Sequence, residues 1–154
     1  MDHANLEKMS YLRAVLKETL RMHPPASLMS RMIEGPFEIA GYRIDKKVNY
    51  LPAHAFMCLS DRYFNDPLEY RPERWLRDHP LKEDVHPFVM LPFGHGPRMC
   101  VGRRFAEQEA KILVCKMVQN FCIEWHRKDL GTMVETLAKP DAPINLTLLE
   151  RNTN

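Results

Sequence analysis

Phe-Gly-His-Gly-Pro-Arg-Met-Cys-Val-Gly, residues 93–102, places one cysteine, Cys100, at the end of a glycine-rich loop. An amphipathic helix is predicted to begin directly after it. A thiolate there is stabilised by the positive end of the helix dipole and by unpaired backbone N–H groups. Arg98 adds a fixed positive charge two residues earlier. The pattern predicts a thiolate that ligates a metal cofactor with anionic groups, as in haem, although the physics alone also allows a reactive thiol.

Composition limits the classes of protein that this chain can represent. Its 154 residues predict a single domain, and 45% hydrophobic residues are enough for a core. The net charge of +2 comes from 22 basic and 20 acidic residues, which gives no case for nucleic-acid binding. No apolar run approaches the roughly 20 residues of a membrane-spanning helix. Without a Cys-x-x-Cys pair, neither a zinc site nor a disulfide framework is expected, and the other cysteines are predicted to be small core residues: Cys58, Cys115 and Cys122.

Hydrophobic spacing predicts two long helices, over residues 6–22 and 101–121, the first of them stopped by Pro24 and Pro25. Between them lie short pieces that are prone to form strands, a short helix, and an irregular stretch over 63–92. The fold class is therefore predicted to be mostly α-helical with small β-sheets. The predicted smaller elements are strands over 27–33, 48–51 and 121–125, a hairpin of 37–39 with 42–44 around Ala40-Gly41, a helix over 54–60, and a final hairpin of 133–137 with 144–149.

Two further motifs extend the argument beyond the cysteine loop. Glu18 and Arg21 lie three residues apart on the first helix, within Lys-Glu-Thr-Leu-Arg-Met-His-Pro-Pro at 17–25, and Arg-Pro-Glu-Arg-Trp stands at 71–75. Taken alone, the first pair is typical of a solvated surface ion pair. Together with residues 93–102, however, these motifs resemble the cytochrome P450 family: its K helix with Glu-x-x-Arg, its Pro-Glu-Arg-Phe segment with Trp75 in place of Phe, and its Phe-x-x-Gly-x-Arg-x-Cys-x-Gly loop.

The resemblance implies a set of roles around haem b. Cys100 matches the axial thiolate ligand of the iron, and Arg98 matches a partner of a haem propionate. Arg31 matches a second propionate partner, and Phe93 matches the aromatic residue that shields the sulfur from water, beside Gly94. The resemblance also implies that Arg74 joins Glu18 and Arg21 in a buried triad that locks the cysteine loop.

By the same resemblance, residues 1–154 are the C-terminal part of a single P450 domain that runs from the K helix to a terminal hairpin, with the N-terminal two thirds absent. The whole protein would be a monooxygenase that inserts one oxygen atom from O2 into a lipophilic substrate, while the isolated piece is expected to be inactive. Two segments resemble substrate-contacting ones. Their residues are Ala26, Ser27, Leu28, Met29, Leu137 and Ala138.

Arg13 and Lys17, four residues apart on the first helix, match K-helix positions that dock an acidic, adrenodoxin-like ferredoxin in mitochondrial-type animal P450s. That resemblance implies a sterol or steroid substrate and a location on the matrix side of the mitochondrial inner membrane, with peripheral membrane association. Three alternatives remain open: a microsomal-type enzyme of the endoplasmic reticulum that acts on foreign compounds, a truncated non-catalytic haem-binding protein, and a peroxide-handling or isomerase-type haem-thiolate protein.

Overall fold

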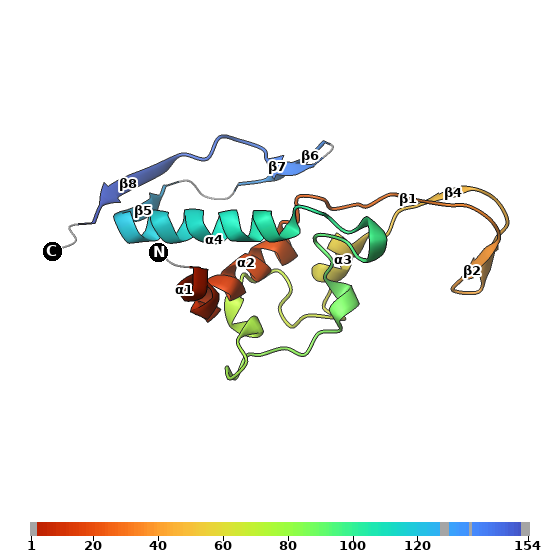
Figure 1. The fold of residues 1–154 in the computed structure, drawn as a ribbon, viewed down its shortest axis with the longest axis horizontal. Helices are drawn as coiled ribbons and strands as arrows, with labels where there is room; N and C mark the ends of the chain where they lie inside the picture. Colours follow the sequence, from red (N-terminus) through yellow and green to blue (C-terminus); the bar gives the residue numbers. More distant parts are fainter. Residues whose placement is uncertain (1–2, 127–129, 136, 152–154) are drawn as a thin grey trace.

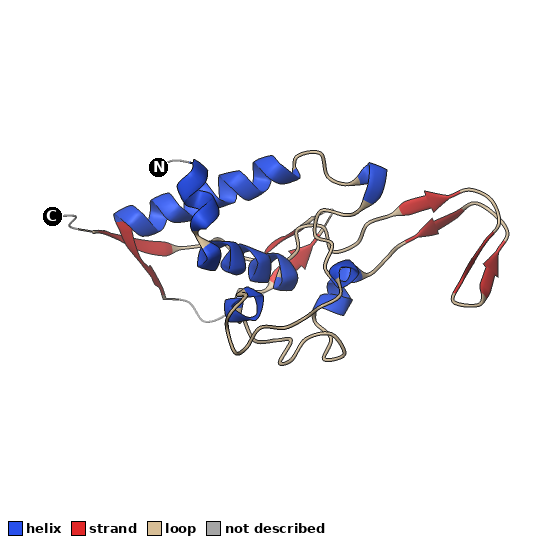
Figure 2. Cartoon of the chain, turned by 60° about the horizontal axis from the view of Figure 1, so that its bottom comes forward, coloured by secondary structure: helices blue, strands red, loops and turns tan. Residues whose placement is uncertain are grey.

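The computed structural model describes residues 3–126, 130–135 and 137–151. Helices form the centre, and short antiparallel strand pairs lie at two opposite ends of the molecule and, for one pair, along its middle (Figures 1 and 2). The two longest helices, α2 and α4, contact each other. The helices are α1 His3–Lys8, α2 Ser10–Met22, α3 His54–Cys58 and α4 Arg103–Asn120, with 3₁₀ turns η1 Pro72–Trp75, η2 Pro87–Val89 and η3 Gly96–Arg98.

The prediction of a single helix over residues 6–22 is wrong, because the helix is interrupted at Met9. This residue has φ −77° and ψ 79°, so α1 ends at Lys8 and α2 begins at Ser10. The apolar spacing continues across the break, which is why the periodicity does not reveal it. Met9 lies instead against α4, with its sulfur 3.8 Å from the sulfur of Cys115. The second helix also begins later than predicted, at Arg103 rather than residue 101.

A narrow two-stranded ribbon extends away from the helices (Figure 1). Strand β1 (Arg31–Ile33) pairs with β4 (Val48–Tyr50), and the predicted hairpin of β2 (Phe37–Ile39) with β3 (Tyr42–Ile44) is confirmed. Ala40 and Gly41 have φ of +50° and +80°. Positive φ at both central residues is the geometry of a tight hairpin turn that follows the twist of its strands.

The predicted final hairpin of 133–137 with 144–149 is wrong. Strand β8 (Leu146–Glu150) pairs with β5 (Phe121–Trp125), and β6 (Thr132–Val134) pairs with β7 (Ala138–Pro140). The β5–β8 register sets apolar residues opposite one another, as in Ile123 with Leu148, and such cross-strand pairs stabilise a sheet. Cys122 is exposed on this two-stranded sheet, so its predicted core position is also wrong, whereas Cys58 and Cys115 are buried as predicted.

The irregular stretch between α3 and α4 packs around a small apolar cluster. Cys58, Phe64 and Val89 form its buried centre, and Trp75 is among the residues packed against it. The largest fully buried side chains include three charged ones, Glu18, Arg21 and Arg74, so a polar network lies at the centre of the fold. Apolar side chains of α4 remain on the surface, with Phe105 74% and Leu113 58% exposed. Within the described ranges, no helix is both long and apolar enough to cross a bilayer.

Candidate functional site

The loop that carries Cys100 has a backbone that only glycines adopt easily. Gly94 and Gly96 have φ of +76° and +75°, a region that costs other residues free energy. The loop closes on itself, because the Cys100 N–H donates to the Phe93 carbonyl at 2.9 Å. Gly102 is the N-cap of α4, so Cys100 lies two residues before the N-cap and three before the first helical residue, Arg103. Cys100 is exposed, and its thiol is free.

Cys100 lines a cavity of about 520 Å³ whose walls are mainly apolar. The walls come from α2, residues 25–31, the cysteine loop and the first turns of α4. Arg31 and Arg98, far apart in sequence, line this same cavity, and Arg31 Nη2 lies 3.5 Å from the Arg98 carbonyl oxygen. The structure thus brings a thiol, two guanidinium groups and apolar walls into one space.

Gly94 allows Met29 to pack closely against the loop. A Cβ atom at Gly94 would lie 3.2 Å from the Met29 sulfur, which is tight, and 3.7 Å from Arg31 Nη2, which is ordinary contact. Gly94 therefore lies directly beside both Met29 and Arg31. A thiol with two cations above apolar walls suits a flat apolar cofactor that bears a metal and two carboxylates, and haem has these properties.

Only two of the six residues predicted to contact substrate line the cavity at Cys100. Ala26 and Met29 line the cavity, and Phe93 lies in its wall beside the loop. The other four residues do not line it: Ser27, Leu28, Leu137 and Ala138. The second segment is nevertheless near the first, because the Ala138 N–H donates to the Pro25 carbonyl at 2.7 Å.

Glu18, Arg21 and Arg74 meet in a fully buried network. Arg21 Nε and Nη2 donate to the two oxygens of Glu18, each at 2.9 Å, and Arg74 Nε donates to Oε1 at 3.0 Å. All three side chains have no exposed surface. Forked guanidinium–carboxylate contacts of this kind satisfy a buried charge that would otherwise be costly.

Two further donors to Glu18 come from the 71–75 motif and were missed at the sequence level. The Arg71 N–H donates to Oε1 at 2.9 Å, and the Trp75 indole Nε1 donates to Oε2 at 2.8 Å. Burial by itself would raise the pKa of Glu18, but the hydrogen bonds from Arg21, Arg71 and Trp75, together with the Arg21 charge, outweigh burial and lower it. Glu83 was also missed, and its carboxylate accepts from Arg74 Nη1. The only sequence signal for Arg71 and Trp75 is the 71–75 motif itself, which places Trp75 next to Arg74. Glu83 lies outside that motif.

The network holds a different segment from the expected one. Arg21 Nη1 donates to the Cys58 carbonyl at 2.6 Å and Nη2 to the Glu69 carbonyl at 3.1 Å, while Arg74 bonds the Asn65 carbonyl at 3.0 Å. These carbonyls belong to residues 58–69, and no hydrogen bond between the described residues links the network to the cysteine loop. The connection is indirect, through the apolar cluster in which Cys58 contacts Val89.

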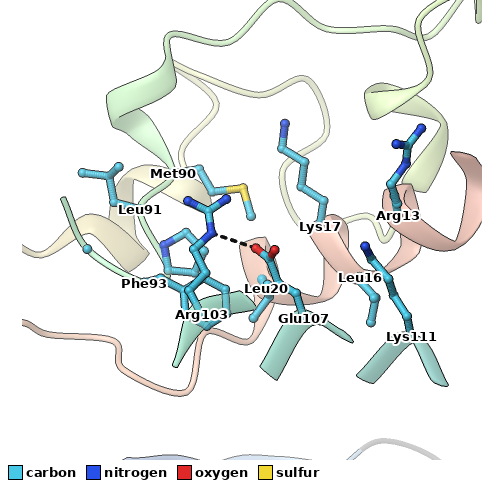
Figure 3. Close-up of a pocket in the computed structure, with 12 residues that line it drawn as sticks. Arg13, Leu16, Lys17, Leu20, Met90, Leu91, Phe93, Arg103, Glu107 and Lys111 are labelled. Carbon is cyan, nitrogen blue, oxygen red and sulfur yellow. Dashed lines mark hydrogen bonds and ion pairs between the residues drawn. The ribbon is translucent and has the colours of Figure 1, made fainter. Parts of the chain in front are cut away.

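Arg13 and Lys17 line a second cavity, of about 250 Å³, between α2 and the start of α4. Both side chains extend from the same side of α2, near an ion pair in which Arg103 Nε lies 2.9 Å from Glu107 Oε1 (Figure 3). The Lys17 ammonium sits 3.9 Å from the centre of the Trp75 ring, and burial lowers its pKa. The two predicted docking residues are therefore brought together, but in different environments.

The comparisons with known proteins identify the family. A free thiol in a glycine loop and two guanidinium groups line one cavity, and the family model of cytochrome P450 matches residues 1–148. The chain belongs to the cytochrome P450 family, whose members bind haem b through a cysteine thiolate.

Individual relatives match the chain over almost its whole length. It is 36% identical to Probable cytochrome P450 49a1 of Drosophila melanogaster over 96% of the chain, and 36% identical to the mitochondrial cytochrome P450 302a1 of the same species over 90%. It is 33% identical to the mitochondrial Sterol 26-hydroxylase of Homo sapiens over 97%. The match spans only 26%, 28% and 29% of these relatives' own lengths.

Proposed function

We propose that the protein formed by this chain is a haem-thiolate monooxygenase in which Cys100 is the axial ligand of haem iron. The observation that carries the proposal is that Cys100, Arg98 and Arg31 line one apolar cavity. When bound, haem supplies the oxygen chemistry of the family, and a thiolate ligand favours O–O cleavage.

The residues of this chain have separate tasks in that proposal. Cys100 donates its thiolate, while the Arg98 and Arg31 guanidinium groups bind the anionic edge of the cofactor. Phe93 lies in the wall of the same cavity, and its ring would limit the contact of the sulfur with water. Gly94 allows Met29 to pack closely against the loop. Ala26 and Met29 contribute apolar wall for a lipophilic substrate.

We further propose the mitochondrial type, with electrons from an acidic ferredoxin and a sterol or steroid as substrate, on the matrix side of the inner membrane. Several similar proteins are named mitochondrial, and one is named a sterol hydroxylase, which supports this choice. Arg13 and Lys17 provide positive charge on one side of α2 for an acidic partner.

The haem proposal is tested by reconstituting the chain with haem and recording the carbon monoxide difference spectrum of the reduced sample. Wild type should give the red-shifted band of thiolate-ligated haem, and Cys100→Ser should lose it. Cys122→Ser is the matched control, because Cys122 is another exposed free thiol. If Cys100→Ser kept the band, or if Cys122→Ser lost it, the assigned ligand would be wrong.

The docking proposal is tested with charge reversals and an acidic ferredoxin at low salt. Arg13→Glu should weaken binding at least tenfold, because steering by a few cations is strong when screening is weak. Lys17→Glu also breaks the contact with Trp75, so its unfolding curve must be measured in parallel. Arg43→Glu, on the distant β2–β3 hairpin, is the control. Equal affinities for Arg13→Glu and Arg43→Glu would refute docking at α2.

A further inference from the structure

A third cavity, of about 300 Å³, lies between α2 and the chain that leaves η1. Three of its lining residues are cations, Arg13, Lys17 and Arg77, and none of its lining residues is acidic. Ser10 contributes a hydroxyl group, and Trp75 forms part of the wall. The cavity shares no residue with the one at Cys100, so a ligand here would not compete for the proposed haem site.

The guanidinium groups around this cavity have no carboxylate partner in the part of the chain that the structure describes, where neither Arg13 nor Arg77 takes part in an ion pair. Glu18 lies within its buried network, and Glu73 accepts from the Tyr11 hydroxyl at 3.1 Å. Glu107, which lines the adjoining cavity with Arg13, pairs with Arg103. Like charges that share a cavity repel one another, and a bound anion would remove that cost.

The arrangement of the donors indicates which anion fits. Ser10, Arg13 and Lys17 follow one another at three- and four-residue steps, so they share one face of α2. Arg77 approaches from the opposite wall. Lys17 is exposed but is held in place by the contact of its ammonium with the Trp75 ring.

We propose that this cavity is a binding site for a phosphate group, with Arg13 and Arg77 as opposed guanidinium ligands, Lys17 as a point charge and Ser10 as a hydroxyl ligand. Guanidinium groups bind phosphate oxygens in pairs, and three cations suit a dianion better than a single carboxylate. The proposal does not depend on haem or on a ferredoxin. It does imply that a phosphate compound would occupy two cations that the proposed ferredoxin contact uses.

Phenyl phosphate is the probe, titrated into the 154-residue chain and followed by calorimetry and by the ³¹P resonance. Wild type should show saturable binding. Arg77→Gln should weaken it at least tenfold, because Arg77 lines this cavity and not the two described above. Arg77→Lys should retain part of the affinity. Arg43→Gln removes the same charge from the β2–β3 hairpin and should bind as wild type.

Vesicles of phosphatidylcholine with and without phosphatidic acid distinguish a lipid headgroup from a soluble phosphate ester as the source. Binding to either that depends on Arg77 supports the proposal and assigns the source. Equal losses in Arg77→Gln and Arg43→Gln would show only general surface attraction and would overturn it. The proposal would also be overturned if neither phenyl phosphate nor the phosphatidic acid vesicles showed saturable binding, or if Arg77 affected only ferredoxin binding. Equal losses in the two variants, or the absence of binding, would leave the haem and docking proposals standing.

Discussion

Trp75→Phe tests how much the buried network depends on the indole. The Trp75 Nε1 donates to Glu18 Oε2 at 2.8 Å, and Glu18 has no exposed surface. Phenylalanine keeps an aromatic ring in place but cannot donate, so one oxygen of a buried carboxylate loses a donor. A hydrogen bond to a charged group contributes about 1.5–3 kcal/mol, and the weaker attraction of Lys17 to phenylalanine adds about 0.5 kcal/mol. We expect a loss of about 2 kcal/mol in the free energy of unfolding.

The assay is urea unfolding followed by far-ultraviolet circular dichroism, since the substitution removes a tryptophan fluorophore. Glu18→Gln and the double variant complete a double-mutant cycle. Glu18→Gln alone should cost about 3–5 kcal/mol because it leaves Arg21 buried without a counter-charge and Arg74 with Glu83 alone. The cycle should give a coupling energy of about 1 kcal/mol or more between Trp75 and Glu18. A Trp75→Phe loss below about 0.5 kcal/mol, or additive losses, would refute the assigned hydrogen bond.

Three further outcomes follow from the geometry. The lowered pKa of Glu18 stabilises the fold at pH values above the pKa of a free glutamate, about 4.3, and this stabilisation is lost as the pH falls through the pKa of Glu18 in the folded chain. The acid-unfolding curve of Glu18→Gln should therefore lack that part of the pH dependence, and identical curves for wild type and variant would contradict the argument. Gly94→Ala should lower the melting temperature more than Gly96→Ala, since both need positive φ but only a Cβ at 94 meets other side chains, and equal shifts would count against the close approach. Iodoacetamide at pH 8 should label exposed Cys122 and spare Cys58, because burial raises the pKa of the Cys58 thiol to about 11; peptide mapping by mass spectrometry that finds both labelled would refute this.

Local pattern predicted the elements better than their partners. The hairpin around Ala40-Gly41 was predictable because Gly41 tolerates positive φ and short strand-prone pieces flank it on both sides. The break at Met9 was not, since one non-helical residue leaves the apolar spacing intact. The pairing of β8 with β5 was not predictable either, because it depends on which strand is nearby in space, and nearness in sequence favoured the wrong partner.

The same limit applies to the site. Cys100 and Arg98 are adjacent in one loop, so a motif contains them both. Arg31 lies far away in sequence, and only the resemblance associated it with the loop before the structure placed it in the same cavity. For the buried network, the resemblance supplied three members, but the carbonyls that they hold, such as that of Cys58, carry no sequence signal because any residue offers a backbone oxygen.

Helix α2 contributes side chains to all of these features. Glu18 and Arg21 lie in the buried network, Leu16 and Leu20 line the cavity at Cys100, and Arg13 lines the other two cavities. The network bonds this helix to carbonyl groups of residues 58–69, whereas no hydrogen bond between described residues joins the helix to the cysteine loop. Weakening the network should therefore move the helix and disturb all three cavities together, while changes in the loop should affect only the cavities that the loop lines. A Glu18→Gln chain that kept full affinity for both haem and phosphate would show that the cavities are independent of the network.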